Sequence, residues 1–240
     1  MTENAATAGP VTATSRAAAR LSLAAAATFL VLLAALHVIK PELDPSWRMV
    51  SEYEIGRYGW MMVLAFLSLA FSCATLFVAI RSQIQTTGGR IGLALLVVSA
   101  LGMTIAAIFT TDPITASQDE LTTHGNLHGL GALLGIPGFP IAAMLISLSL
   151  VRNRAWSPAW RALLWTGVLT WIRLLVFVLS VALLLPQGNG GFGPDVLVGW
   201  PNRLLVLAYS VWLMVVAWHA LRLSRRDPKP TGRAVAGRGA

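Results

Sequence analysis

Long, continuously apolar stretches separated by short polar segments dominate the chain. Six of them lie near residues 21–39, 58–80, 91–110, 125–151, 162–185 and 204–223. Each is close to the roughly 20 residues that an α-helix needs to cross about 30 Å of hydrocarbon. None shows the apolar and polar alternation of strands in membrane barrels. The pattern therefore predicts an all-α, polytopic membrane protein built as a bundle of six transmembrane helices.

The segments outside these stretches predict a simple domain organisation. An N-terminal tail at 1–19, rich in Ala, Thr and Gly, and a basic C-terminal tail at 224–240 are both expected to be disordered. Residues 20–223 form the membrane domain. Composition agrees, because 56% hydrophobic and 12% charged residues exclude a soluble globular domain, in which about a quarter of residues are charged.

The basic residues predict the orientation of the chain. Thirteen of the 18 Lys and Arg residues lie in the two tails and in the loops at 81–90 and 152–161, whereas eight of the ten acids lie in the other loops. By the positive-inside rule, both termini are cytoplasmic. The net charge of +8 is then mainly a signal of topology, so membrane lipids, and not nucleic acid, are the expected partners. Sixteen Arg against two Lys indicate a GC-rich genome and hence a bacterial cytoplasmic (inner) membrane.

Glycines and prolines single out the fourth stretch. The spacings Gly125-xxx-Gly129 and Gly131-xxx-Gly135 are typical of helices that approach each other closely, so we expect this span to be central. Pro137 and Pro140 remove backbone donors and should kink it, freeing the carbonyls of Leu133 and Ile136. The kink serves either packing or a hinge that lines a ligand cavity.

Arg173 lies near the middle of the fifth stretch, about twelve residues from its outer end. A central arginine costs at least about 2.5–3.5 kcal/mol on insertion scales, so it must face protein or water. We expect it to join a polar layer and to donate to the carbonyl of Leu133 or Ile136. Its role is either structural or that of an anchor for an anion or a headgroup.

Most other polar side chains lie in the predicted outer loops. His124 and His128 are four residues apart, which places two imidazoles on one helix face at a spacing suited to a shared metal. With Asp112, and with His37, Glu52 or Glu54 nearby, they form a candidate zinc site. The same histidines can instead cap the helix and bind loop carboxylates, or transfer protons.

Three segments of the chain resemble the bacterial membrane family known as domain of unknown function 998 (DUF998). They are Ser51-Glu52-Tyr53-Glu54-x-Gly56-x-x-Gly59-Trp60, Phe109-Thr110-Thr111-Asp112-Pro113 and Thr123-His124-Gly125-x-Leu127-His128. The resemblance covers residues from about 20 to 223. It implies a six-span bundle in a bacterial membrane with these segments clustered at the outer face, and it favours His128 over His124. It implies no activity.

Three functions follow from these features, and whether the protein is an enzyme stays open, as does its oligomeric state. The first is binding of a lipid headgroup or small amphiphile in a polar pocket open to the extracytoplasmic side. The second is a metal-dependent intramembrane hydrolase, in which Asp112, His124 and His128 hold zinc and Ser51 assists. The third is a transporter of small solutes. The expected ligand-binding residues are Ser51, Glu52, Tyr53, Asp112, His128, Arg173 and Arg203.

Overall fold

The structure, a computed structural model, describes residues 13–188 and 191–226, and within them it contains helices and no strand. Six helical segments are long and apolar enough to cross a membrane, which confirms the predicted class of fold. They are α1 (Ala13–Ile39), α2 (Gly59–Ile80), α3 (Thr87–Ile108), α4 (Thr123–Gly135) continued by α5 (Gly138–Val151), α6 (Trp160–Leu184) and α7 (Gly199–Arg226).

The helical boundaries revise the predicted tails. Because α1 begins at Ala13, residues 13–19 are helical and not part of a disordered tail. At the other end α7 continues past residue 224 to Arg226. The remainder of both tails, 1–12 and 227–240, lies outside the described residues, and their disorder stays a prediction.

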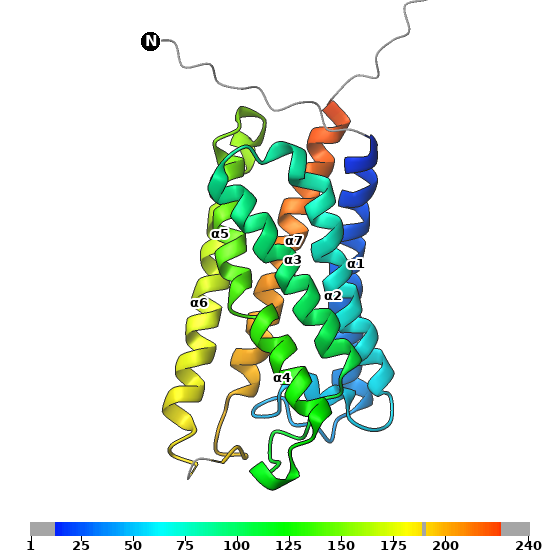
Figure 1. Cartoon of the computed structure of the whole chain (residues 1–240), viewed down its shortest axis with the longest axis vertical. Coiled ribbons are helices and arrows are strands. Elements are labelled where there is room, and N and C mark those ends of the chain that lie inside the picture. Colours follow the sequence, from blue (N-terminus) through cyan, green and yellow to red (C-terminus); the bar gives the residue numbers. More distant parts are fainter. Residues whose placement is uncertain (1–12, 189–190, 227–240) are drawn as a thin grey trace, which may run out of the picture.

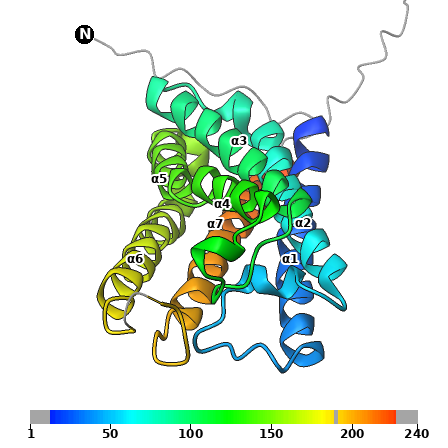
Figure 2. The same ribbon diagram turned by 60° about the horizontal axis from the view of Figure 1, so that its bottom comes forward.

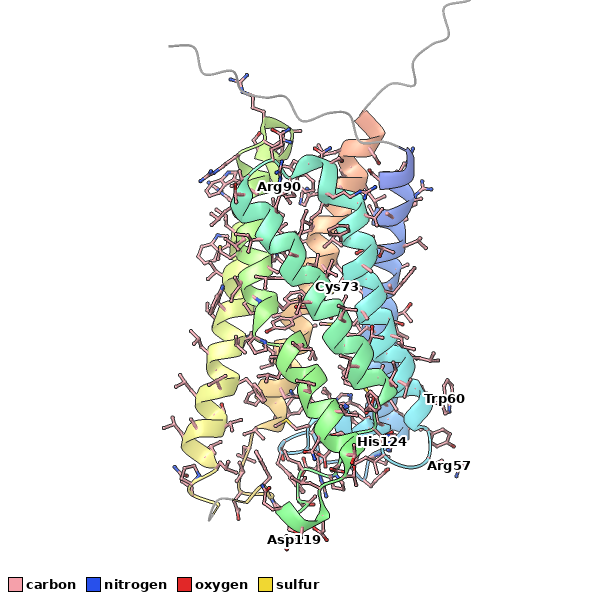
Figure 3. The ribbon with its side chains drawn as sticks, in the orientation of Figure 1. Arg57, Trp60, Cys73, Arg90, Asp119 and His124 are labelled. Carbon is pink, nitrogen blue, oxygen red and sulfur yellow. The ribbon has the colours of Figure 1, made fainter. Side chains whose placement is uncertain are left out.

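The helices pack as an antiparallel bundle (Figure 1). Helix α1 packs against α2 and α7, α3 packs against α2, α4 and α5, and α6 lies at the edge against α5 and α7 (Figure 2). The first turn of α1 and the last turn of α7 lie at the same end of the bundle. Arg90 lies toward that end, whereas Arg57 and Asp119 lie at the opposite one (Figure 3). We call this second end the outer end, following the predicted orientation.

A proline break divides the fourth span as expected. Helix α4 ends at Gly135 and α5 begins at Gly138, with Pro137 between them. The carbonyl of Ile136 is freed, and it accepts a hydrogen bond from the Tyr209 hydroxyl at 2.8 Å. The side chain at this carbonyl is therefore a tyrosine of α7 and not the predicted Arg173.

The first half of the fourth span, α4, is not surrounded by other helices, which corrects for this half the central position predicted from its glycines. Helix α4 packs mainly on α3, through Gly131 and Gly135 facing Gly102. Its opposite face leaves Leu130 and Leu133 exposed. Small residues allow one close helix pair, and this does not require the helix to be surrounded.

Candidate functional site

The loop between α1 and α2 is folded against the outer end of the bundle by the 3-10 helix η1 (Val50–Glu54). Lys40, buried at the end of α1, donates from Nζ to the carbonyls of Tyr53 at 3.3 Å and Ile55 at 2.6 Å. Burial lowers the pKa of Lys40. A buried ammonium that binds two carbonyls on either side of Glu54 fixes the backbone from which that carboxylate projects.

Arg203, in the first turns of α7, connects three parts of the outer end. Its Nε donates to His37 Nε2 at 2.7 Å, and its terminal nitrogens donate to the carbonyls of Arg48 at 2.6 Å and Gly199 at 3.1 Å and to the Tyr53 hydroxyl at 3.2 Å. Only 6% of Arg203 is exposed. The predicted ligand residues Arg203 and Tyr53 therefore direct their polar atoms at each other and at the protein.

Glu52 connects the first outer loop to the second. One carboxylate oxygen accepts from Arg48 at 2.7 Å and from the backbone N–H of Ile114 at 3.0 Å, and the other accepts from the backbone N–H of Met49 at 2.9 Å. The side chain is 1% exposed. Both oxygens are engaged, which makes Glu52 a structural anchor of the 111–118 segment.

Glu54 and His128 form a buried acid and base pair beneath this network. His128 Nδ1 lies 3.3 Å from Glu54 Oε2 and within 2.9 and 3.0 Å of the carbonyls of Phe109 and Ala106. Glu54 Oε2 also accepts from the backbone N–H of Thr111 at 3.3 Å. Three acceptors surround Nδ1, so Nδ1 carries a proton. Within the described residues, Glu54 Oε1 is buried and has no hydrogen-bond partner.

A cavity of about 80 Å³ lies between α2, α3, α4 and α7, directly under η1. Its polar lining consists of Ser51, His128, Asn202 and Tyr209. Asn202 uses its side-chain oxygen to accept the first backbone N–H of η1 at 3.0 Å. The other walls are apolar or glycine: Val50, Phe66, Leu69, Met103, Ala106, Gly131, Ala132, Gly135, Ile136 and Val206.

His128 lines this cavity, and its two ring nitrogens differ in their partners. The bonds at Nδ1 fix the ring, and within the part of the chain that the structure describes Nε2 has no partner. Ser51 also lines the cavity, whereas Glu52 and Tyr53 of the same predicted segment are not among its lining residues. The cavity thus combines apolar walls with a few polar groups, as small-molecule sites do.

The predicted zinc ligands are directed to different partners. Asp112 accepts from the backbone N–H and the hydroxyl of Thr122, both at 2.8 Å, and so anchors the residue that caps α4. The ring of His124 is exposed and lies edge-on to Phe109, with 5.5 Å between centroids, at the outer end in Figure 3. No group of three His, Cys, Asp or Glu side chains suited to a metal occurs among residues 13–188 and 191–226. Asp112, His124 and His128 therefore do not form one cluster.

Arg173 is not part of the outer site. It is half-buried on α6 and is not among the residues that line the cavity. The predicted bond to a carbonyl of the α4 break is wrong, because Tyr209 binds Ile136 and the exposed Leu133 lies on the outward face of α4.

Sequence reasoning named the right loops but missed several members of the site. Lys40 and Asn202 are not among the predicted site residues, and Glu54 is predicted only as a zinc ligand. The available signal was weak: Lys40 and Asn202 end or begin a span, where polar residues are ordinary. The alternative prediction that a histidine of α4 would bind a loop carboxylate agrees with the contact of His128 and Glu54.

Comparison with known proteins identifies one family. A family model described as "Protein of unknown function (DUF998)" matches residues 23–219, which is most of the chain. No curated protein and no solved structure matches. The six apolar helices make the chain a multi-pass membrane protein, while the bacterial inner membrane stays a prediction.

Proposed function

The chain belongs to the DUF998 family, and we propose that this member binds a small amphiphile in the cavity beneath η1, with its polar head against His128. The observation that carries the proposal is a cavity-lining imidazole whose Nδ1 is bonded to backbone carbonyls, while its Nε2 has no partner among the described residues. Binding of this kind is the favoured interpretation of the sequence, now restricted to one cavity.

The charge state of the pair indicates which head group fits. The Glu54 side chain is 1% exposed, and within the described residues His128 is its only cationic neighbour at ion-pair distance. We propose that His128 is an imidazolium in the complex, because its Nδ1 proton lies among three acceptors that include Glu54. In that state Nε2 donates into the cavity. A head with an oxygen acceptor, such as an ester carbonyl or an alcohol oxygen, fits this donor.

The walls indicate the rest of the ligand. The cavity extends from Ser51 and Asn202 at η1 to Ile136 at the α4 break, between helices whose outward faces lie in lipid. Apolar walls favour an acyl or alkyl chain, while the polar lining fixes the orientation of its head. At about 80 Å³ the cavity is smaller than a whole lipid, so we propose that it takes the head and the first carbons of a single-chain membrane lipid, whose tail continues into the surrounding hydrocarbon.

Photo-crosslinking tests the proposal directly. We expect a monoacylglycerol with a diazirine in its acyl chain to label the purified protein at cavity residues such as Leu69 or Met103. The His128→Ala variant should bind this probe about tenfold more weakly, because it loses a hydrogen bond from a charged donor worth about 1.5–3 kcal/mol. Mass spectrometry of the labelled peptides and competition with unlabelled monoacylglycerol provide the measurements.

Two further variants separate binding from folding. His124→Ala removes an exposed histidine of the same helix and should leave labelling unchanged. Ala132→Phe keeps His128 but fills the cavity that Ala132 lines, and should abolish labelling. Equal labelling of the wild type, His128→Ala and Ala132→Phe would rule out this cavity as the site.

The α4 break favours transport as a second function. Gly135 and Ile136 line the cavity, and the break at Pro137 is where a helix can hinge. If the amphiphile is moved across the membrane, proteoliposomes should transfer a fluorescent monoacylglycerol between leaflets faster than empty vesicles, and Ala132→Phe should stop this. If transfer is no faster than in empty vesicles, the protein binds the amphiphile but does not transport it.

A further inference from the structure

Arg173 occupies a position in α6 that no water or interface can reach easily. It lies about 16 Å along the helix from Leu184 and about 20 Å from Trp160, at about 1.5 Å per residue. Its guanidinium makes no hydrogen bond, ion pair or ring contact within the described residues. A charged group at such depth is stabilised only by a partner or by local water.

The chain itself contains no acid at this depth. The ten acids are Glu3, Glu42, Asp44, Glu52, Glu54, Asp112, Asp119, Glu120, Asp195 and Asp227, and all of them lie in tails or outer loops of the sequence. A second copy of the chain would bring another Arg173 and no carboxylate. A lipid phosphate lies at the interface, about half of the roughly 30 Å hydrocarbon thickness away.

The surface beside Arg173 has the pattern of a helix-docking seam. Trp165, Leu169, Ile172, Val176, Leu179 and Leu183 repeat at alternating spacings of four and three residues, as the core positions of a coiled coil do. All except the half-buried Leu169 are exposed, with Trp165 70% and Leu183 64% exposed. Arg173 directly follows Ile172 and so flanks this seam, at a position from which coiled coils form charge pairs between helices.

Helix α6 is also the span with the least packing inside the bundle. Its most apolar window is 17% buried, against 33% or more for the other spans. It lies at the edge, where α5 and α7 are the spans that it packs against (Figure 2). Lipid tails can cover an apolar helix face, but they offer no hydrogen bond or opposite charge to a guanidinium near the centre of the membrane.

From the unpaired Arg173 and the adjoining seam we propose that α6 docks a transmembrane helix of another membrane protein, which supplies an Asp or Glu near its centre. The apolar seam gives the close packing, and the ion pair gives the choice of partner. This inference is independent of the amphiphile cavity, which Arg173 does not line.

Synthetic transmembrane helices test the proposal. We use leucine-rich peptides with a single central Asp, Asn or Leu, in phosphatidylcholine vesicles with the full-length protein, and measure association by resonance energy transfer. The Asp peptide should associate about tenfold more strongly than the Leu peptide, consistent with about 1–2 kcal/mol for polar contacts between model helices. Arg173→Gln should remove this preference.

Charge reversal and a matched control identify the contact. Arg173→Glu should prefer a peptide with a central Lys, whereas Arg161→Gln, at the beginning of the same helix, should behave as the wild type. Val176→Ala should weaken the association of the Asp, Asn and Leu peptides alike, because it removes packing surface from the seam. Arg173→Gln should leave monoacylglycerol labelling unchanged, which separates this test from that of the cavity.

Three results would overturn the proposal. They are equal association of the Asp and Leu peptides, retained preference in Arg173→Gln, and, when phosphatidylglycerol is added to the vesicles, a loss in Arg173→Gln that is confined to the binding of this lipid. The last result would identify a lipid headgroup as the occupant.

Discussion

The Arg203→Met variant is expected to unfold with a free energy about 3 kcal/mol or more below that of the wild type. Arg203 donates four hydrogen bonds from a side chain that is nearly fully buried, to a histidine, a tyrosine and two carbonyls. Methionine fills much of the same space but removes the donor from all four acceptors, of which Tyr53 and Gly199 are buried, and a buried acceptor without its partner costs about 1–3 kcal/mol. Reversible unfolding in mixed micelles, followed by circular dichroism, measures the difference.

The location of the damage distinguishes this result from general instability. Arg203 joins α1, through His37, to the η1 loop, through Arg48 and Tyr53, so hydrogen exchange in 40–58 should rise more than in α5 or α6. The free energy of unfolding of Arg203→Lys should lie between those of the wild type and Arg203→Met, because a single ammonium cannot replace all the donors of a guanidinium. Arg57→Met, at an exposed arginine of the same loop, is the control. A loss no larger than that of the control would contradict the assigned role.

The spans were predictable because lipid imposes one rule on every residue that it surrounds. A backbone in hydrocarbon must satisfy its own hydrogen bonds, so apolar length alone is enough to predict a helix. The break in the fourth span was predictable because proline has no backbone N–H to donate to the helix. A central position of the fourth span did not follow from Gly131 and Gly135. The same glycine spacing occurs in a helix that approaches one neighbour closely, here at Gly102, and in a helix that is surrounded by several.

The outer site was predictable only as far as the segments that form it. Glu52 and Glu54 lie in one motif and have the same chemistry. Glu52 nevertheless joins two loops through hydrogen bonds, whereas Glu54 contacts His128. Which of the two carboxylates faces His128 depends on how η1 is placed by Lys40, at the end of α1, and by Asn202, which is far away in sequence. His124 and His128 share a helix face, but α3 ends near Phe109, so only the deeper histidine is covered.

The close contact of α3 and α4 gives the second large expected effect, for Gly102→Ala. A Cβ at Gly102 would lie 2.5 Å from the carbonyl oxygen of Gly131 and 2.5 Å from the backbone nitrogen of Gly135. Backbone atoms cannot rotate away as a side chain can, so α4 must move as a unit. We expect a loss of about 1–3 kcal/mol in the free energy of unfolding, the usual cost of overpacking.

This shift should also reach the cavity, because His128 lies on α4 one turn before Gly131 and binds carbonyls of residues at the end of α3. Labelling by the monoacylglycerol probe should therefore fall in Gly102→Ala even at temperatures where the variant is fully folded. Gly129→Ala is the matched control, since its Cβ meets nothing within 4 Å and the exchange favours the helix by up to about 1 kcal/mol. If Gly102→Ala is as stable as Gly129→Ala and labels equally well, the tight α3 and α4 contact does not position His128.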